Sequence, residues 1–304
     1  MRHLAGAVLA LGLLAAPLRA EPSTPPLLKA EASPDPALLL AGASPDPALA
    51  IIDTALAEGR FDAAAEVLQR TLPLRPGPEL QLRVAELALA RGALAEAATG
   101  FADLAADPAV AATAQQGLGI TQLQQGNLVA ARAALDAALA ADAGLLRAWN
   151  ARAVVADRSR DFVAADAAYA RALALDPRAA MVRANQGYSL LLRGRHADAE
   201  AALVAALAID SGLAPAATNL RLARAMQGRY RDAFAGSTRA GLAADLNTVG
   251  FAAMARGDYA VAEAYLNRAL ALNPRFDPVA FANLAYLKSI TDPLGTGVGE
   301  DLTR

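Results

Sequence analysis

One pattern of small and aromatic residues recurs about every 34 residues through most of this chain of 304 residues. Within residues 149–177, four residues mark one copy at offsets of 0, 4, 7 and 12: Ala165, Tyr169, Ala172 and Pro177. A step of 34 residues leads to the matching residues of the next copy: Ala199, Leu203, Ala206 and Ser211. A fixed period in the thirties is typical of helix–turn–helix units that stack, because each unit has an apolar face that it cannot bury alone. The period therefore predicts an all-α fold with a continuous core.

Seven copies can be placed by a turn residue and a small residue five positions after it. The turn residue is Arg160 in the fourth copy and glycine in the others: Gly59, Gly92, Gly126, Gly194, Gly228 and Gly257. We expect the repeats to start near residues 45, 78, 112, 146, 180, 214 and 243, and a closing helix near 277. The last interval is five residues shorter than the one before it, which predicts an irregular joint at Ala240–Ala244. Glycine at the eighth position predicts a close approach of the two helices of a pair: Gly119, Gly187 and Gly250.

The residues around Trp149 and Tyr169, with the turn, the small residues and Pro177, resemble the tetratricopeptide repeat, a unit of two antiparallel helices. The resemblance implies a right-handed superhelix of helix pairs, an α-solenoid, over residues 45–289, with a C-terminal capping helix. It also implies that the first helices line a concave groove, where such proteins bind other proteins or peptides.

The segments before the repeats predict export. Residues 1–20 have a short basic start and an apolar run, which predicts a secretory signal peptide cleaved after Ala20. An uncleaved anchor is the alternative, although the run is shorter than the ~20 residues that span a bilayer. Residues 21–44 are rich in proline and predict a flexible linker, with a proline-rich ligand segment as the alternative. We therefore expect an exported, periplasmic protein with no membrane span in the mature chain.

The C-terminal segment, residues 290–304, contains the glycine-rich stretch Gly295–Gly299. Glycines of this kind can cradle a phosphate when a strand precedes them and a helix follows. Neither is expected here, so the segment predicts a disordered tail.

Composition argues against several classes of protein. The formal net charge of −2 does not suit a general nucleic-acid binder, which needs a basic excess. The chain has no cysteine, and His196 is the one histidine after the predicted signal peptide, so neither a hydrolase triad nor a metal site is indicated. We expect no cofactor, no metal and no enzymatic activity.

Asparagines recur on the predicted first helices at equivalent positions: Asn150, Asn185, Asn219 and Asn247, with Asn283 on the closing helix. In tetratricopeptide proteins that bind peptides, asparagines near this position commonly hold the ligand. An amide can donate and accept at once, which suits the main chain of an extended peptide. The alternative is that these asparagines bond neighbouring helices or water.

Arginines predominate in the middle of the chain. Between Leu146 and Leu242, 14 arginines face 8 acidic residues, a net of +6. Four of them on the predicted first helices are candidate partner-binding residues beside Tyr188: Arg147, Arg158, Arg183 and Arg221. Arginine captures carboxylates with two parallel hydrogen bonds, so an acidic segment of a partner protein is expected to lie across repeats four to six. A generally solvated charged surface is the alternative.

The C-terminal repeats carry a second resemblance. Residues Leu246–Ser289, with Asn219–Ala233 before them, are similar to the repeat proteins that accompany assembly of bacterial tight-adherence (Flp) pili. This resemblance implies a scaffold of the cell envelope that binds components of the pilus or secretion machinery. Many such proteins are lipoproteins, whereas this chain has no cysteine to lipidate. The alternatives are a general periplasmic adaptor for cell-wall enzymes or polysaccharide export, and a cell-wall-active enzyme.

Overall fold

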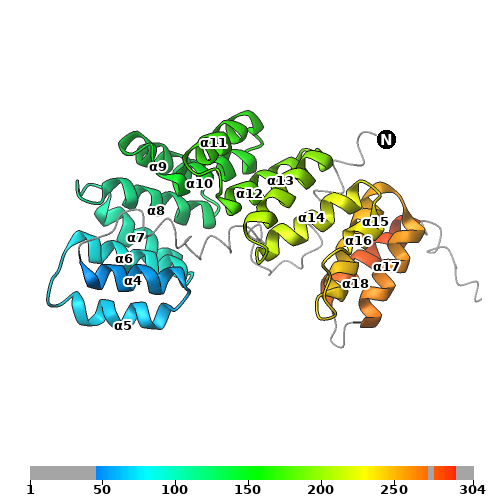
Figure 1. Ribbon diagram of the computed structural model, residues 1–304, viewed down its shortest axis with the longest axis horizontal. Coiled ribbons are helices and arrows are strands. Elements are labelled where there is room, and N and C mark those ends of the chain that lie inside the picture. Colours follow the sequence, from blue (N-terminus) through cyan, green and yellow to red (C-terminus); the bar gives the residue numbers. More distant parts are fainter. Residues whose placement is uncertain (1–45, 273–276, 292–304) are drawn as a thin grey trace, which may run out of the picture. The chain divides into compact units, whose positions relative to one another are not determined.

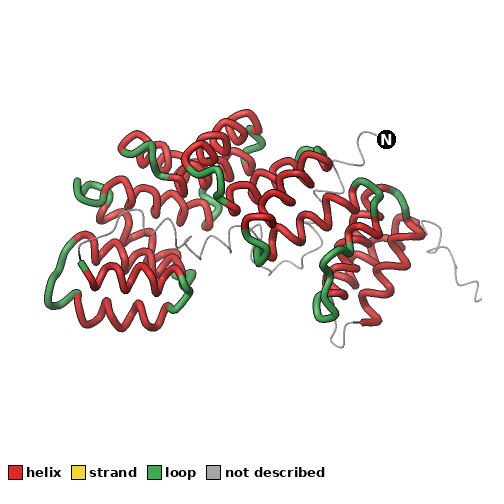
Figure 2. The backbone as a smooth tube through the Cα atoms, viewed as in Figure 1, coloured by secondary structure: helices red, strands yellow, loops and turns green. Residues whose placement is uncertain are grey.

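The computed structural model of the chain describes residues 46–272 and 277–291 (Figure 1). Over these residues the regular structure is entirely α-helical, without a strand, as Figure 2 shows and as the repeat period predicts. The predicted signal peptide and linker lie outside the described residues. So does most of the predicted tail, but its first two residues, Ile290 and Thr291, belong to the last helix.

The helices alternate as first and second members of antiparallel pairs. The first helices begin within two residues of the expected repeat starts: α4 (Pro47–Ala57), α6 (Pro78–Ala90), α8 (Ala111–Gln124), α10 (Leu146–Arg158), α12 (Ala180–Leu192), α14 (Ala214–Met226), α16 (Leu242–Arg256) and the closing α18 (Pro278–Thr291). The second helices follow each turn: α5 (Phe61–Thr71), α7 (Leu94–Leu104), α9 (Leu128–Ala141), α11 (Phe162–Leu175), α13 (His196–Ile209), α15 (Tyr230–Ala233) and α17 (Tyr259–Leu272).

The described residues form two compact units. The N-terminal unit comprises residues 46–189 and 205–215, and the C-terminal unit comprises residues 190–204, 216–272 and 277–291. In the N-terminal unit, α4, α6, α8 and α10 pack side by side in one layer, and the second helices pack against them. Its largest buried side chains, Phe101 and Tyr169, lie between the two layers.

The eighth-position glycines permit the close packing that the sequence predicts. A Cβ atom on Gly119 in α8 would lie 2.6 Å from Cγ of Leu135 in α9. In the C-terminal unit, a Cβ atom on Gly250 in α16 would lie 2.8 Å from Cγ of Leu266 in α17. Both distances are too short for real atoms, so glycine is required where these helices meet.

The turn of the fourth repeat is the exception among the turns. Arg160 has φ +59°, and it is the only non-glycine residue with a positive φ in the described ranges. The six repeat turns with glycine, such as Gly126 at φ +84°, reach the same left-handed region without a Cβ penalty.

Replacing Arg160 with glycine is therefore expected to raise the free energy of unfolding by about 0.5–1 kcal/mol, because the Cβ of arginine is unfavourable at positive φ. Chemical denaturation followed by circular dichroism measures the change. Ser159→Gly is the control. Ser159 has φ −84°, so glycine relieves no backbone strain there and only increases the conformational entropy that folding must overcome. Equal stability changes in the two variants would contradict this explanation.

The sixth repeat has a very short second helix. α15 contains only four residues, and residues 234–241 are non-helical up to the start of α16. The irregular joint thus begins about six residues before the position predicted from the spacing. Gly236 has φ +80°, and Ser237 and Thr238 are poor helix formers, which explains why the helix ends there. Aromatic rings fill the space: Tyr265 of α17 lies 5.5 Å from Phe234 and 6.2 Å from Tyr230, between ring centroids.

Candidate functional site

The asparagines of repeats four and five face each other. Nδ2 of Asn185 in α12 donates a hydrogen bond of 2.9 Å to Oδ1 of Asn150 in α10. Both side chains are buried, with exposed fractions of 5% for Asn150 and 1% for Asn185. In this structure, the two asparagines therefore bond neighbouring helices, which is the alternative stated for them in the sequence analysis. A role in holding a ligand stays a prediction.

The asparagines of the C-terminal unit follow a similar plan. Nδ2 of Asn283 in α18 donates to Oδ1 of Asn247 in α16 at 3.0 Å, and this pair is only partly buried. Asn219 in α14 is 4% exposed, and its Nδ2 has no hydrogen-bond acceptor among the described residues. Oδ1 of Asn185 is likewise buried and has no hydrogen-bond donor among the described residues. A buried polar atom without a partner is costly, so Asn185 and Asn219 each have an unused hydrogen bond to offer.

The four candidate arginines all have acceptors within their own unit. In the N-terminal unit, Nη1 of Arg158 donates to the carbonyl oxygen of Leu123 at 2.9 Å, and Nη2 of Arg183 donates to the carbonyl oxygen of Pro177 at 2.7 Å. Nη1 of Arg147 lies 3.4 Å from Oε1 of Glu86. These bonds fix the guanidinium groups without removing their charge.

Arg221 differs from the other three because it is buried. Its side chain is 8% exposed, and Nη1 lies 2.8 Å from Oδ1 of Asp245 in the first turn of α16. Burial lowers the pKa of Arg221, and the charge of Asp245 opposes this effect. Nη2 also lies 3.5 Å from Oγ of Ser237 in the non-helical segment. The pair thus ties α14 to the start of α16 beside the short sixth repeat.

A buried carboxylate joins three helices of the N-terminal unit, and sequence reasoning did not predict it. Oδ2 of Asp157 in α10 accepts from the hydroxyl of Tyr169 in α11 at 2.8 Å, and Oδ1 accepts from Oγ of Ser189 in α12 at 2.5 Å. Each of these residues is at most 6% exposed. The half-buried Tyr188 lies beside them, and its pKa is raised by burial, with Asp157 adding to the rise and Arg158 opposing it.

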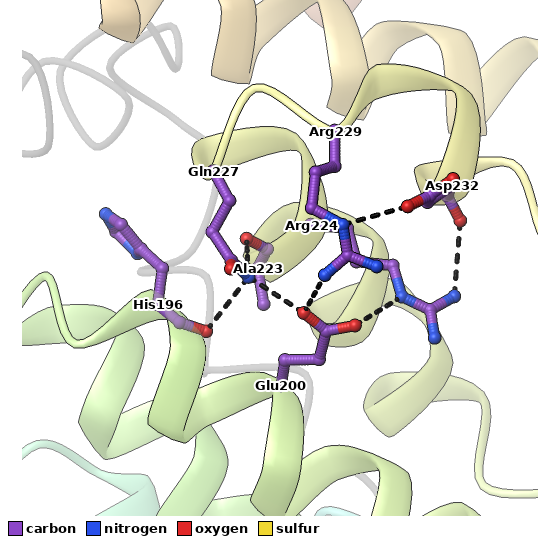
Figure 3. Close-up of polar contacts among 7 residues, drawn as sticks. All are labelled: His196, Glu200, Ala223, Arg224, Gln227, Arg229 and Asp232. Carbon is purple, nitrogen blue, oxygen red and sulfur yellow. Dashed lines mark hydrogen bonds and ion pairs between the residues drawn. The ribbon is translucent and has the colours of Figure 1, made fainter.

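A second polar cluster lies where α13 meets α14 and α15 in the C-terminal unit (Figure 3). Glu200 in α13 accepts from Nε of Arg224 at 2.9 Å, from Nε2 of Gln227 at 2.9 Å and from Nη1 of Arg229 at 2.6 Å. Arg229 also pairs with Asp232 in α15 at 2.8 Å. Burial works toward a higher pKa of Glu200, but the bonds from Arg224 and Gln227 and the charges of both arginines outweigh it, so the pKa is lowered. The carboxylate holds the end of α14 and the start of the short α15 on α13.

The lowered pKa of Glu200 has a consequence for acid stability. Because the folded state holds this carboxyl below its unfolded pKa of about 4.3, its contribution is complete above that value and is lost as pH falls through the folded pKa. We expect Glu200→Gln to lower the melting temperature at pH 7 and to flatten its fall below about pH 4.3. Asp198→Asn is the matched control, because Asp198 is 54% exposed and pairs only with Arg195 on its own helix turn. The same acid profile for Glu200→Gln and the unchanged chain would contradict this assignment.

His196 lies at the edge of the same cluster. Its carbonyl oxygen accepts from Nε2 of Gln227 at 3.4 Å, while its ring atom Nδ1 is buried and has no partner among the described residues. Burial lowers the pKa of His196, and the charge of Arg256 adds to this effect. The described part of the chain contains no group of three or more residues that could hold a metal ion. His196 is the first residue of α13 and packs beside the end of α14.

No helix within the described ranges combines the length and the hydropathy needed to cross a membrane.

Family comparisons agree with the helix-pair architecture. Tetratricopeptide repeat models match residues 49–111, 150–214 and 243–276, which together span just over half of the chain. No enzyme family is among these matches. No curated protein sequence matches the chain.

Solved structures show the same fold at low identity. A tetratricopeptide repeat protein from Parabacteroides merdae is 14% identical, with 79% of this chain and 97% of that chain covered and a TM-score of 0.53. A chain of the APC/C hetero-tetramer Cut9–Hcn1 is 19% identical, with 84% and 52% covered and a TM-score of 0.54. PilF of Pseudomonas aeruginosa is also similar, at 22% identity with 62% and 94% covered, but its TM-score of 0.46 is too low to support the fold.

Proposed function

The chain belongs to the tetratricopeptide repeat family, and we propose that it is a non-catalytic scaffold of the bacterial cell envelope that binds another protein along its first helices. The observation that carries this proposal is the layer of first helices α4, α6, α8 and α10 in the N-terminal unit. In a solenoid of helix pairs, such a layer presents a continuous surface from successive repeats, which suits an extended partner.

The chemistry of this layer supports a polar partner. Half-buried side chains along it include Arg147 and Arg158 of α10, and the half-buried Tyr188 lies on the next first helix, α12; each has its polar end beside a protein acceptor or charge. Guanidinium groups held in this way can still receive carboxylates from outside, because each carries five donors. An acidic segment of the partner is therefore the ligand that we propose for repeats four and five.

Pilus assembly is the finer part of the proposal. It is supported by the resemblance of Leu246–Ser289 and Asn219–Ala233 to the repeat proteins of tight-adherence (Flp) pilus systems. It is also supported by the signal-peptide pattern of residues 1–20, which favours a place in the periplasm. A general periplasmic adaptor for cell-wall enzymes or polysaccharide export is the second candidate, because the same fold and the same export pattern would serve it.

Crosslinking and pull-down of the tagged chain from its own cells, with mass spectrometry of the captured proteins, tests this proposal. Capture of the pilus secretin or of inner-membrane assembly components is the expected result. Capture of peptidoglycan enzymes or polysaccharide export proteins alone would replace the pilus assignment with the general adaptor. Recovery of the tagged chain in the cytoplasmic fraction would contradict both.

A further inference from the structure

The closing helix α18 has no second helix after it, unlike the other first helices of the chain. Each of α4, α6, α8, α10 and α16 packs against the second helix of its own pair. α18 packs against α17 and α16, and no helix follows it among the described residues. The sequence beyond it is not expected to supply one, because it is rich in poor helix formers: Pro293, Gly295, Gly297 and Gly299.

The repeat period identifies the face of α18 that a second helix would cover. A step of 34 residues leads from Met254 of α16 to Lys288 of α18. Met254 is 4% exposed and lies in one core cluster with Leu266 of α17, the second helix of its pair. Lys288 is exposed at the same position, and Phe281, two turns before it, is 53% exposed. The face that is covered on α16 is therefore open on α18.

Four residues run along this open face, and we call them the α18 stripe: Asp277, Phe281, Ala285 and Lys288. They are four, four and three residues apart, which places them on one side of a helix. The stripe begins with an acidic residue, ends with a basic one and is apolar between them. The terminal helix of a solenoid usually presents a polar outer face, whereas Lys288 is the one charged residue of α18. Exposed apolar surface at such a place indicates an interface.

The order of charges along the stripe is self-complementary. When two copies of α18 run antiparallel, Asp277 of each copy lies opposite Lys288 of the other. Phe281 then lies near Ala285 of the other copy, whose small side chain leaves room for the ring. Asp277 caps α18 by accepting from two backbone N–H groups at 3.0 and 3.1 Å through Oδ1 alone. A carboxylate can accept about four hydrogen bonds, so the capping bonds leave it able to receive Lys288.

We propose that the α18 stripe binds a second copy of this chain, with the two α18 helices antiparallel and related by a two-fold axis. Each copy then supplies the helix that would cover α18 of the other, and the same patch serves on both sides, as two-fold contacts require. A contact between two single helices buries less than about 1,200 Å², so the association is weak and reversible. This inference goes beyond the proposed function, because it concerns self-association and a surface outside the first-helix layer of the N-terminal unit.

Sedimentation equilibrium of the purified chain tests the proposal, and a reversible monomer–dimer equilibrium with a dissociation constant of about 1–100 µM is expected. Phe281→Ser should weaken the association at least about tenfold, because it removes the largest apolar side chain of the contact from both copies. Val279→Ser is the matched control. Val279 is 59% exposed on the same helix but lies outside the stripe, so the dissociation constant should change by less than about twofold.

Charge reversal tests the antiparallel arrangement. Lys288→Glu places a carboxylate opposite Asp277 of the other copy, so the association should weaken by about fivefold at low salt. Adding Asp277→Asn removes this repulsion and keeps a side chain that caps the helix, so it should restore part of the association. If the second substitution restores nothing, the antiparallel pair is wrong.

Three further results would overturn the proposal. The first is a chain that stays monomeric throughout this concentration range. The second is a dimer that Phe281→Ser leaves unchanged, because such a dimer forms through another surface. The third is a monomeric chain that dimerises only after residues 292–304 are removed, because the stripe is then covered by the chain's own C-terminal segment. Circular dichroism of each variant verifies that its helix content is unchanged.

Discussion

Asp157→Ala is expected to lower the free energy of unfolding by about 2–4 kcal/mol, because it removes the acceptor of two buried hydrogen bonds to a charged group. Tyr169 and Ser189 donate these bonds from α11 and α12, so the loss should be shared by repeats four and five. Chemical denaturation measures the total loss in the free energy of unfolding. Hydrogen exchange of the amides in α10, α11 and α12 shows where protection falls, since repeat proteins lose stability locally.

Two milder variants at the same cluster test whether the hydrogen bonds of Asp157 cause the loss of stability. Tyr169→Phe removes one of the two bonds, and we expect a smaller loss than for Asp157→Ala. Asp157→Asn keeps an oxygen acceptor but loses the charge. Its loss of stability should therefore lie between the losses for Tyr169→Phe and Asp157→Ala. If Asp157→Ala unfolds at the same denaturant concentration as the unchanged chain, the cluster does not hold these helices together.

Gly117→Ala is expected to destabilise the N-terminal unit by about 1–3 kcal/mol, although alanine is the better helix former. A Cβ atom on Gly117 would lie 2.3 Å from Cε1 of Phe101, whose ring is fully buried, so the ring or the helix has to shift. Denaturation followed by circular dichroism measures this change.

A compensating substitution provides the control for Gly117→Ala. Phe101→Leu removes the ring atoms that meet the new methyl group, so the double variant should be less destabilised than the sum of the two single variants. Simple additivity would show that the methyl group and the ring do not compete for the same space.

The sequence predicted the helix pairs because their signals are local. A turn residue followed by a small residue five positions later marks the start of each second helix, and this sufficed to place the starts of α8 and α10 within one residue. Gly119 was also predicted, because it stands at the eighth position of the repeat, which faces the second helix of its own pair at Gly119 and at Gly250. Gly117 was not, since its partner Phe101 belongs to the preceding pair and no repeat position marks that contact.

The candidate site was less predictable, because several of its contacts also join residues of different helix pairs and no repeat position marks them. The positions of Asn150 and Asn185 on equivalent helices follow from the period, but their mutual bond depends on how closely α10 and α12 approach. The cluster of Asp157 with Tyr169 and Ser189 joins residues 12 and 32 positions apart, which correspond to no single repeat interval. One signal in the sequence could have indicated this cluster: Asp157 directly follows an apolar stretch of α10, where a buried acidic residue needs hydrogen-bond donors.

Site-specific photocrosslinking in the chain's own cells would test most directly whether the first helices bind a partner. A benzophenone side chain is placed at Thr113, Met181 or Tyr188, which are half-buried on first helices. It is placed in parallel at Val129 or Val163, which are 87% and 83% exposed on second helices. A scaffold that binds through its first helices predicts one partner protein crosslinked from the first set and not from the second. Crosslinks to a partner from Val129 and Val163 alone would contradict it.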